Sequence, residues 1–422
     1  MLTSIVGINW GDEGKGRMVD LLSSDYDIIC RYQGGNNAGH TVVNDKGKFI
    51  LNLLPSGILR DSTVNVMGNG MVIDLEHLVG EMGRLTEKGI RISPENLKIS
   101  DKAVICMPYH KLMDCMEEER LADKKFGSTR RGIAPVYADK YMKKALRMED
   151  LLHLDGLAEK VHDIVEWKNI TVTGYGHEPI KAEEMMDWLR KFGTQLIPYI
   201  TDVSEYLQGA MEAGTNIMFE AQLGALRDID LGIYPYTSSS STIAAYAPIG
   251  AGIPGAKLTD TIGIMKAYST CVGEGPFTAE MFGDEAEALR KAGGEYGAAT
   301  GRPRRVGPFD IPASRYGVKV QGATEIALTK LDVLSYLDRI PVCVAYEVDG
   351  EKTVNFPTGE RLNRAKPVVE YVPGFGDVSG CRTWESLPEA AKNYVRYLEK
   401  AVGCKITYVS VGAGRDEYVK ID

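Results

Sequence analysis

A loop rich in glycine, carboxylates and lysine lies close to the start of the chain. Residues 7–17 read Gly-Ile-Asn-Trp-Gly-Asp-Glu-Gly-Lys-Gly-Arg and follow an apolar run that is typical of a buried strand. A glycine-rich turn between a strand and a helix exposes backbone N–H groups to phosphate oxygens, and Lys15 could bridge two phosphates. Asp12 and Glu13 could ligate Mg²⁺ or accept a proton. The loop therefore predicts phosphate chemistry, and a charged, solvated turn is the alternative.

The same loop departs from the standard P-loop in two ways. Six residues separate Gly7 from Gly14, where a P-loop has four, and Gly16 stands where a P-loop carries its magnesium-binding hydroxyl. The extra carboxylates of Asp12 and Glu13 are therefore the groups most relevant to the chemistry of this loop, either as Mg²⁺ ligands or as proton acceptors.

A second glycine-rich run, Gly34-Gly35-Asn36-Asn37-Ala38-Gly39-His40-Thr41, leads to a histidine. An imidazole can protonate a phosphoryl or oxo group near neutral pH, and the carbonyl of Gly39 could ligate a hard cation. The alternative is that His40 is a structural histidine. Together the two loops favour nucleotide chemistry.

Four later segments could also bind anions or a base. A basic run over 124–147 surrounds Gly127-Ser128-Thr129 and could hold a monophosphate, although a solvated charged face is the alternative. Three arginines in 299–305 could bind a dicarboxylate or a phosphate. An amide near Gln222 could read a purine edge, and Asp332 could accept two guanine N–H bonds, which adenine does not offer. The serine run after Thr237 has a flexible loop as its alternative.

Composition restricts the class of protein. The 422 residues carry a net charge of −9, and 44% are hydrophobic. The negative charge argues against a nucleic-acid surface, and neither a membrane span nor a signal peptide is expected. Seven scattered cysteines without a Cys-x-x-Cys pair favour reduced thiols and a cytoplasmic location over disulfides or zinc.

Hydrophobic periodicity predicts alternating strands and helices, which imply an α/β fold with a central, mostly parallel β-sheet flanked by helices. Both glycine-rich loops would then lie at the carboxyl ends of strands, where such sheets bind ligands. Residues 101–200 are more helical and charged and are expected to form an insertion within one continuous domain, 1–422. The predicted strands are 26–31, 63–67, 97–100, 216–219, 326–328, 342–346 and 405–409, and the predicted helices are 75–88, 111–122, 182–192, 203–213, 284–292 and 388–402.

Several motifs together resemble the adenylosuccinate synthetase family. The resemblance rests on residues 10–16 (Trp-Gly-Asp-Glu-Gly-Lys-Gly) and 31–41 (Arg-Tyr-Gln-Gly-Gly-Asn-Asn-Ala-Gly-His-Thr). Shorter matches follow at 55–59, 68–70, 300–305 and 329–332, so it covers essentially the whole chain. It implies a P-loop-NTPase-like fold and a homodimeric GTP-dependent ligase of purine biosynthesis. The enzyme would join inosine monophosphate (IMP) and L-aspartate to give adenylosuccinate, GDP and phosphate through a 6-phosphoryl-IMP intermediate.

The resemblance also implies roles for individual residues. Asp12, His40 and Lys15 would be catalytic, and Mg²⁺, the expected cofactor, would be held by Asp12 and Gly39. IMP would be bound by Asp12, Lys15, Asn37, Ala38, Gly39, His40, Thr129, Lys143, Gln222, Thr237 and Arg302. Aspartate would be bound by Ala299, Thr300, Arg302 and Arg304. GTP would be bound by Gly11, Glu13, Gly14, Lys15, Gly16, Arg17, Gly39, Thr41, Arg304, Lys330, Asp332, Ser410 and Gly412.

Three positions depart from the family pattern. Gln222 is displaced by one position, with Leu223 at the family's glutamine, Lys143 replaces an arginine that the neighbouring subunit supplies, and Arg130 replaces a glycine. The first two departures, at Gln222 and Lys143, leave open a related ligase that acts on a guanine nucleotide. A nucleotide-binding regulator without catalysis is the second alternative, although the retained Asp12 and His40 argue against it.

Overall fold

The centre of the molecule is a ten-stranded sheet in which every neighbouring pair of strands is parallel except β19 and β20. The computed structural model describes all residues except 45–46, 298–300, 302 and 422. The strands, in spatial order, are β20 (Tyr418–Lys420), β19 (Ile406–Ser410), β15 (Glu325–Thr329), β11 (Asp260–Lys266), β1 (Leu2–Gly7), β10 (Ile217–Glu220), β2 (Ile28–Arg31), β5 (Val64–Met67), β7 (Leu97–Ser100) and β9 (Ile200–Thr201).

Helices cover both faces of this sheet, because successive residues of a buried parallel strand point to opposite sides. On one face, Ile5 and Met218 pack with Met18 and Val19 of α1 (Lys15–Leu22). On the other face, Phe219 packs with residues of α8 (Val203–Glu212) and α9 (Ala247–Ala251). Outside the region 101–200, the other helices are α2 (Leu75–Glu87), α10 (Gly283–Gly293), α11 (Ile311–Gln321), α12 (Glu360–Asn363) and α13 (Glu389–Val402).

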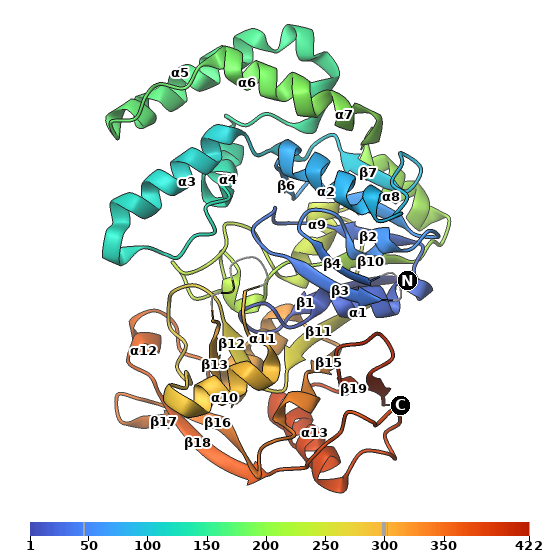
Figure 1. Ribbon diagram of the computed structural model, residues 1–422, viewed down its shortest axis with the longest axis vertical. Coiled ribbons are helices and arrows are strands. Elements are labelled where there is room, and N and C mark those ends of the chain that lie inside the picture. The colour runs from blue at the N-terminus through green and yellow to red at the C-terminus, as the bar shows by residue number, and fades with distance from the viewer. Residues whose placement is uncertain (45–46, 298–300, 302, 422) are drawn as a thin grey trace.

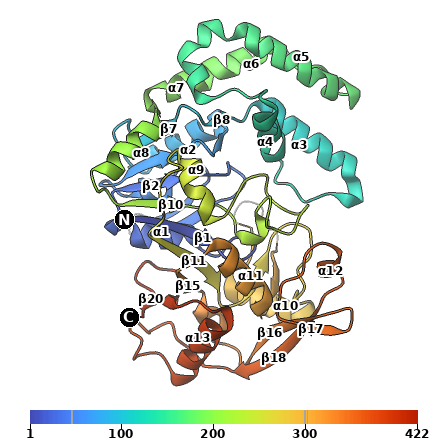
Figure 2. The ribbon, with the colours of Figure 1, turned by 180° about the vertical axis from the view of Figure 1, so that it is seen from behind.

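The insertion predicted over 101–200 is helical in the structure. It contains α3 (Pro108–Leu121), α4 (Ile133–Met142), α5 (Ala158–Gly174), α6 (Ala182–Trp188) and α7 (Thr194–Leu196). These helices lie at one end of the molecule (Figures 1 and 2). Leu151 and Leu196 of this region share one buried cluster with Leu78 and Ile99. Because the core continues across the boundary, we propose that the chain forms one continuous domain.

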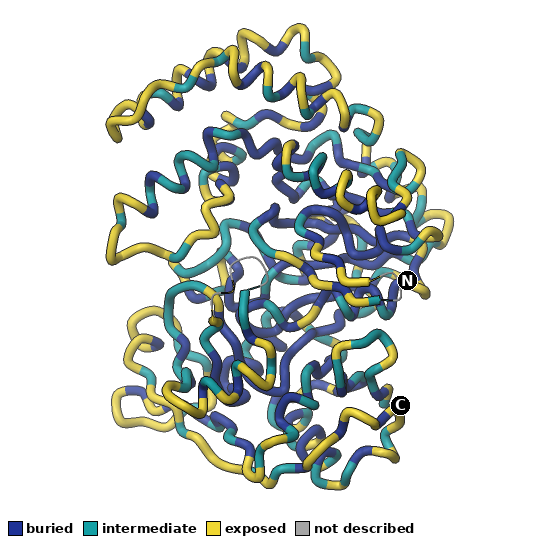
Figure 3. Tube along the Cα trace, viewed as in Figure 1, coloured by how far each residue is buried: buried dark blue, intermediate teal, exposed yellow. Residues whose placement is uncertain are grey.

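A second, four-stranded sheet lies at the opposite end of the molecule (Figure 1). It consists of β14 (Phe309–Asp310), β16 (Arg339–Val348), β17 (Glu351–Thr353) and β18 (Lys366–Pro373). The predicted strand 342–346 lies in β16 of this sheet and not in the central one. Figure 3 shows that the buried backbone is concentrated in the central sheet, whereas β17, β18 and the outer helices carry many exposed residues.

Short elements complete the framework around the two glycine-rich loops. The second loop runs from β2 into a hairpin of β3 (His40–Asn44) and β4 (Gly47–Leu51). Smaller pairings join β6 (Val72–Ile73) to β8 (Val104–Ile105) and β12 (Ser269–Cys271) to β13 (Arg305–Gly307). Over the described residues, no helix is both long and apolar enough for a membrane span.

Candidate active site

The first glycine-rich loop connects β1 to α1 and is held in a tight, partly left-handed conformation. Gly11, Asp12 and Gly14 have φ values of 106°, 60° and 99°. Gly7 is required by space, since a Cβ there would lie 2.4 Å from the carbonyl oxygen of Leu223. A non-glycine residue in this region costs roughly 1 kcal/mol, and aspartate tolerates it better than most. The loop therefore presents the Asp12 carboxylate, 31% exposed, from a strained and fixed backbone.

Glu13 ties this loop together from inside. Its Oε1 accepts hydrogen bonds from the backbone N–H groups of Asn9 (3.1 Å) and Gly11 (2.8 Å), and its Oε2 accepts one from Lys15 Nζ at 2.7 Å. Both side chains are buried, and Thr329 donates to the Glu13 carbonyl at 2.7 Å. Glu13 thus shapes the loop and orients Lys15, whereas a contact with GTP stays a prediction.

The two glycine-rich loops contact each other at Gly16 and His40. A Cβ on Gly16 would lie 2.6 Å from the Cβ of His40, so only glycine lets the start of α1 pack against the histidine. The spacing-based prediction that both loops lie at the carboxyl edge of the sheet is confirmed, because they follow the parallel strands β1 and β2.

His40 is oriented by a carboxylate to which the sequence analysis assigned no role. Its Nδ1 lies 2.5 Å from Glu220 Oε1, and Ser56 donates to Glu220 from its backbone N–H (2.7 Å) and its hydroxyl (2.6 Å). Burial lowers the pKa of His40, and Glu220 offsets this in part. With Nδ1 paired to Glu220, Nε2 is buried and has no hydrogen-bond partner within the described part of the chain, so it is available to a ligand. The sequence signal for this role of Glu220 was its position directly after the predicted strand 216–219.

The second loop is shaped by amides from three segments. Gln222 Nε2 donates to the carbonyl of Gly35 (2.8 Å) and to that of Ala38 (3.3 Å), and Asn52 Nδ2 also donates to the carbonyl of Ala38 (3.1 Å). Asn37 Oδ1 accepts from the backbone N–H of Gly35 at 3.2 Å. The fully buried Gln222 side chain therefore supports the loop.

Leu223, at the position where the family's glutamine is expected, has a φ of 64°. It packs beside the first loop, since a Cβ on Gly11 would lie 3.7 Å from Leu223 Cδ2. The amide N–H groups of Gln222 already donate to carbonyls within the protein. A direct contact between Gln222 and a bound base stays a prediction.

The loop that carries Thr129 is fixed by two carboxylates of α3. Asp114 accepts from the Ser128 hydroxyl (2.7 Å) and from the backbone N–H of Gly132 (2.8 Å). Glu118, one turn later, accepts from the N–H groups of Phe126 (3.1 Å) and Gly127 (3.2 Å). Thr129 is exposed on this supported loop.

Two other departures from the family pattern flank α4, one before it and one after it. Arg130 adopts a φ of 56° where glycine is usual, and Lys143 caps the C-terminus of α4 with a φ of 61°. Both side chains are exposed. Exposure leaves Lys143 accessible to a neighbouring subunit.

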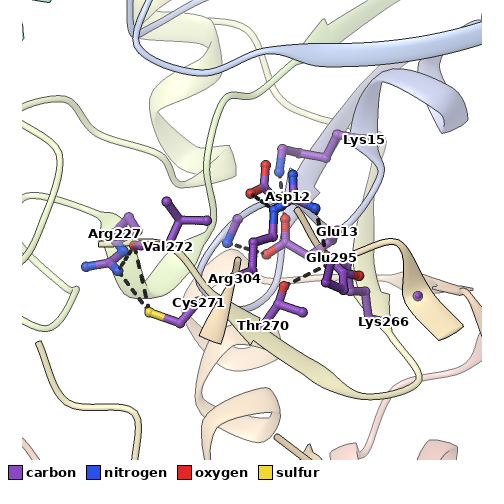
Figure 4. A network of polar contacts seen from close by, with 12 residues as sticks. Asp12, Glu13, Lys15, Arg227, Lys266, Thr270, Cys271, Val272, Glu295 and Arg304 are labelled. Atoms are coloured by element: carbon purple, nitrogen blue, oxygen red, sulfur yellow. Dashed lines mark hydrogen bonds and ion pairs between the residues drawn. The ribbon is translucent and has the colours of Figure 1, made fainter. Parts of the chain in front are cut away.

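Hydrogen bonds to Arg227 and Asp228, which are adjacent in the sequence, hold the segment that contains Thr237. Asp228 accepts from the Thr242 N–H (2.7 Å) and the Ser241 hydroxyl (3.1 Å). Arg227 donates to the carbonyls of Tyr236 and Val272 and to Cys271 Sγ (Figure 4). The serine run is therefore bonded into the structure and is not the flexible loop that was the alternative.

A charged network surrounds Arg304 (Figure 4). Arg304 Nε lies 3.3 Å from Asp12 Oδ2, and its Nη1 donates to Glu295 Oε2 at 2.7 Å. Glu295 Oε1 accepts from Lys266 and Lys330, each at 2.9 Å. Burial lowers the pKa of Lys266 to about 8, although Glu295 opposes the shift. Ala299, Thr300 and Arg302 lie outside the described residues.

Asp332 and the C-terminal loop held by Arg17 are the residues predicted to bind guanine. Asp332 Oδ1 is buried and accepts no hydrogen bond from the described residues, and burial raises the pKa of Asp332. Arg17 does not point into open solvent: it donates to Ser410 Oγ (2.5 Å) and to the carbonyls of Gly412, Gly414 (2.6 Å) and Glu417 (2.9 Å). Arg17 thereby attaches the loop after β19 to α1, and an unpartnered carboxylate oxygen beside it fits the paired N–H donors of guanine.

Contacts link several of the predicted residues from distant parts of the chain. Arg304 lies beside Asp12 and shares Glu295 with Lys330, and the start of α1 packs against His40. Sequence reasoning missed Glu220, Lys266 and Glu295, whose carboxylates and ammonium position other groups. The sequence signal for Lys266 was its place after the short run Ile-Gly-Ile-Met, and the signal for Glu295 was its position four residues before the arginine loop.

Comparisons with known proteins agree with this site. A sequence model of the family described as adenylosuccinate synthetase matches residues 4–419. The adenylosuccinate synthetase of Lactococcus lactis subsp. lactis (strain IL1403) is 44% identical over 417 residues, which cover 98% of this chain and 96% of that protein.

Solved structures give the same result. The fully ligated adenylosuccinate synthetase from Plasmodium falciparum has a TM-score of 0.93 and 34% identity, with 100% of this chain and 99% of that chain covered. The succinoaminodeoxyadenylate synthetase of cyanophage S-2L, bound to dGMP and dATP, shares the fold with a TM-score of 0.63 and 19% identity, over 99% and 95% of the two chains. The chain belongs to the adenylosuccinate synthetase family, and it is a GTP-dependent ligase of purine biosynthesis that joins IMP to L-aspartate.

Proposed function

We propose that Asp12 is the catalytic base and that the reaction proceeds in two steps. In the first step Asp12 accepts the N1 proton of IMP, and the O6 atom, now more nucleophilic, attacks the γ-phosphate of GTP. The Asp12–Arg304 contact of 3.3 Å carries this proposal, because it places the proton acceptor beside a group predicted to bind both GTP and aspartate. An oxygen bound to C6 is a poor leaving group, and phosphorylation converts it into a good one.

Positive charge and N–H donors around the loops would stabilise the transferring phosphoryl group. Lys15 is held by Glu13 beside the phosphate loop. His40, protonated on both ring nitrogens, would donate a hydrogen bond or a proton from Nε2 to the phosphoryl oxygen, and Glu220 would stabilise this imidazolium through Nδ1. The backbone N–H groups of residues 11–17, together with Gly39 and Thr41, would complete the phosphate contacts.

In the second step the amino group of aspartate attacks C6 and phosphate leaves. Arg304 would bind an aspartate carboxylate, together with Ala299, Thr300 and Arg302, which lie outside the described residues. A guanidinium binds a carboxylate with two parallel hydrogen bonds, which orients the amino group toward C6. Because Glu295 accepts from Nη1 and Asp12 lies beside Nε, the remaining N–H groups of Nη1 and Nη2 would be the donors for aspartate.

The site also fits Mg²⁺. Asp12 offers a partly exposed carboxylate and Gly39 a carbonyl, and hard oxygen ligands of this kind suit the ion. Among the described residues no cluster of three His, Cys, Asp or Glu side chains could hold a metal, which suits an ion that shares its ligands with substrate phosphates. Bound there, Mg²⁺ would neutralise charge on the β- and γ-phosphates.

The guanine and IMP phosphate contacts complete the proposal. Asp332 would accept the two guanine N–H bonds, the Lys330 stem would stack on the base, and the Ser410–Gly412 segment would close over it. The phosphate of IMP would be bound by Thr129 and, across a homodimer interface, by Lys143 of the neighbouring subunit. The seven cysteines are free, which supports a reducing, cytoplasmic location.

Phosphate release tests the proposed acceptor. GTP and aspartate are incubated with inosine, guanosine or adenosine monophosphate, and released phosphate and the product's ultraviolet spectrum are recorded. We expect release with IMP only. Preference for guanosine monophosphate would contradict the proposal and assign the base pocket beside Leu223 to guanine. Binding without phosphate release from any acceptor would instead support a regulator.

Replacing Glu220 by glutamine tests its action through His40. Loss of the carboxylate lowers the pKa of His40 further, because the negative charge that opposes desolvation is removed. We expect kcat to fall about 10- to 100-fold. The alkaline limb of the kcat–pH profile should shift to lower pH, since the protonated imidazole is lost earlier.

A double variant provides the control for Glu220. If Glu220 acts only through His40, Glu220→Gln should add no further loss to His40→Asn. Fully additive losses would contradict the coupling, as would an unshifted pH profile in Glu220→Gln.

A further inference from the structure

Glu295 accepts hydrogen bonds from four side chains that belong to different parts of the active site. Its Oε1 accepts from Lys266 Nζ (2.9 Å), Lys330 Nζ (2.9 Å) and the hydroxyl of Tyr268, and its Oε2 accepts from Arg304 Nη1 (2.7 Å). The Glu295 side chain is fully buried. Three of these donors share Oε1 and one binds Oε2, so both oxygens of the carboxylate have partners within the protein.

The four donors come from three strand ends. Lys266 ends β11, Tyr268 follows it, Lys330 follows β15, and Arg304 precedes β13. Glu295 follows the C-terminus of α10. One buried carboxylate therefore joins the arginine beside Asp12 to the lysine of the guanine site.

Backbone contacts hold the same arrangement. The N–H of Arg304 donates to the carbonyl of Glu295 at 3.0 Å, and Arg290 Nε donates to the carbonyl of Arg304 at 2.9 Å. Lys330 also donates to the carbonyl of Gly293 at 2.6 Å, from a backbone with a φ of 60°. Each of the two cations therefore has a defined position relative to the segment 293–295.

Charge balance explains why a carboxylate is needed. Lys266, Lys330 and Arg304 would repel one another if Glu295 were neutral. Burial alone would raise the pKa of Glu295, but the three cations together hold it below the usual range, so the group is ionised at neutral pH. With Asp12 included, the cluster has three cations and two carboxylates, which leaves positive charge for an anionic substrate.

We infer that Glu295 is a positioning residue for ligation, which fixes Arg304 for aspartate and Lys330 for GTP through its two carboxylate oxygens. This inference rests on the proposed roles of Arg304 and Lys330. Glu295 itself is screened from substrates by its four donors. Its effect should therefore be seen in the Michaelis constants of two substrates and not in that of IMP.

The variant Glu295→Gln tests the inference. Glutamine keeps the shape but has only one acceptor oxygen, and its NH₂ group would face a donor of Arg304 or of the lysines. We expect KM for aspartate and for GTP each to rise about tenfold, with KM for IMP changing less than about twofold. Glu295→Asp keeps the charge on a shorter side chain and should recover part of both effects.

Asp310→Asn is the matched control. Asp310 is also a fully buried carboxylate, and it accepts from the Tyr346 hydroxyl (2.6 Å) and the N–H of Ala313 (3.0 Å). We expect this variant to lower the melting temperature without raising KM for aspartate and GTP relative to KM for IMP. If Glu295→Gln does not fold, Glu295→Asp is compared with the parent enzyme. The inference then requires that KM for aspartate and for GTP is higher in Glu295→Asp and that KM for IMP is not.

Three results would overturn the inference. They are an unchanged KM for aspartate in folded Glu295→Gln, an equal rise of all three KM values, and the same KM separation in Asp310→Asn. Measuring Arg304→Leu in parallel distinguishes a failure of the inference about Glu295 from a failure of the proposed role of Arg304. If only Arg304→Leu raises KM for aspartate, the inference about Glu295 fails and the proposed function stands, whereas failure of both variants rejects the assignment of Arg304.

Discussion

Replacement of Asp12 by asparagine should reduce kcat by about 10²- to 10⁴-fold, because the reaction loses the group that accepts the N1 proton of IMP. Asparagine is preferred to alanine as the test. Asp12 adopts a φ of 60°, and asparagine tolerates this left-handed conformation, so the loop should keep its shape. The rate of adenylosuccinate formation, followed by ultraviolet absorbance, measures the effect.

The melting temperature and the binding of GTP provide the control for Asp12→Asn. Glu13, and not Asp12, holds the loop backbone through the N–H groups of Asn9 and Gly11. The melting temperature should therefore stay within a few degrees of the parent value. Substantial residual turnover in a folded Asp12→Asn enzyme would exclude Asp12 as the base.

Arg304→Leu should raise KM for aspartate about a hundredfold, the order expected when one partner of a buried charge pair is removed. The substitution removes the carboxylate-binding fork and also leaves Glu295 Oε2 and Asp12 without their guanidinium partner. Steady-state kinetics with aspartate varied at saturating IMP and GTP measures the change.

Arg304→Lys is the matched variant for this experiment. Lysine keeps the positive charge but cannot form two parallel hydrogen bonds to one carboxylate, so KM for aspartate should lie between the values of the parent enzyme and Arg304→Leu. An aspartate dependence that stays unchanged in Arg304→Leu would remove Arg304 from the substrate site.

Strands and helices with a clear hydrophobic period were predictable from the sequence. The strands β2, β5, β7, β10, β15 and β19 and the helices α2, α3, α8, α10 and α13 lie within a few residues of their predicted positions. In the predicted helix 182–192, α6 ends at Trp188 and a π-helical turn, Leu189–Gly193, follows. A one-residue widening of the helix cannot be seen in the spacing of apolar residues.

The strand β11 was not predicted, although it lies at the centre of the sheet. Its sequence, Asp-Thr-Ile-Gly-Ile-Met-Lys, has a glycine at its middle and charged residues at both ends, and glycine weakens a strand pattern. The structure gives the reason for Gly263: a Cβ there would lie 2.5 Å from Ile8 Cδ1. A tertiary contact with the first loop therefore determines the residue type.

Candidate site residues could be recognised from the sequence where they lie within one loop. The groups of residues 11–17 and 37–41 were recognisable from their spacing, whereas the pairing of His40 with Glu220 joins separate elements. These two residues are 180 positions apart in the sequence. Contacts of this kind depend on which strands are neighbours in the sheet, and one sequence does not specify that order.

The fate of the O6 atom tests the two-step mechanism most directly. IMP that carries a heavy oxygen isotope at O6 is converted with GTP and aspartate, and the released phosphate and the water are analysed by mass spectrometry. Attack of O6 on the γ-phosphate predicts that the label appears in phosphate, one atom for each adenylosuccinate formed. Label found in water, with none in phosphate, would show that aspartate displaces the oxygen without phosphorylation and would contradict the mechanism.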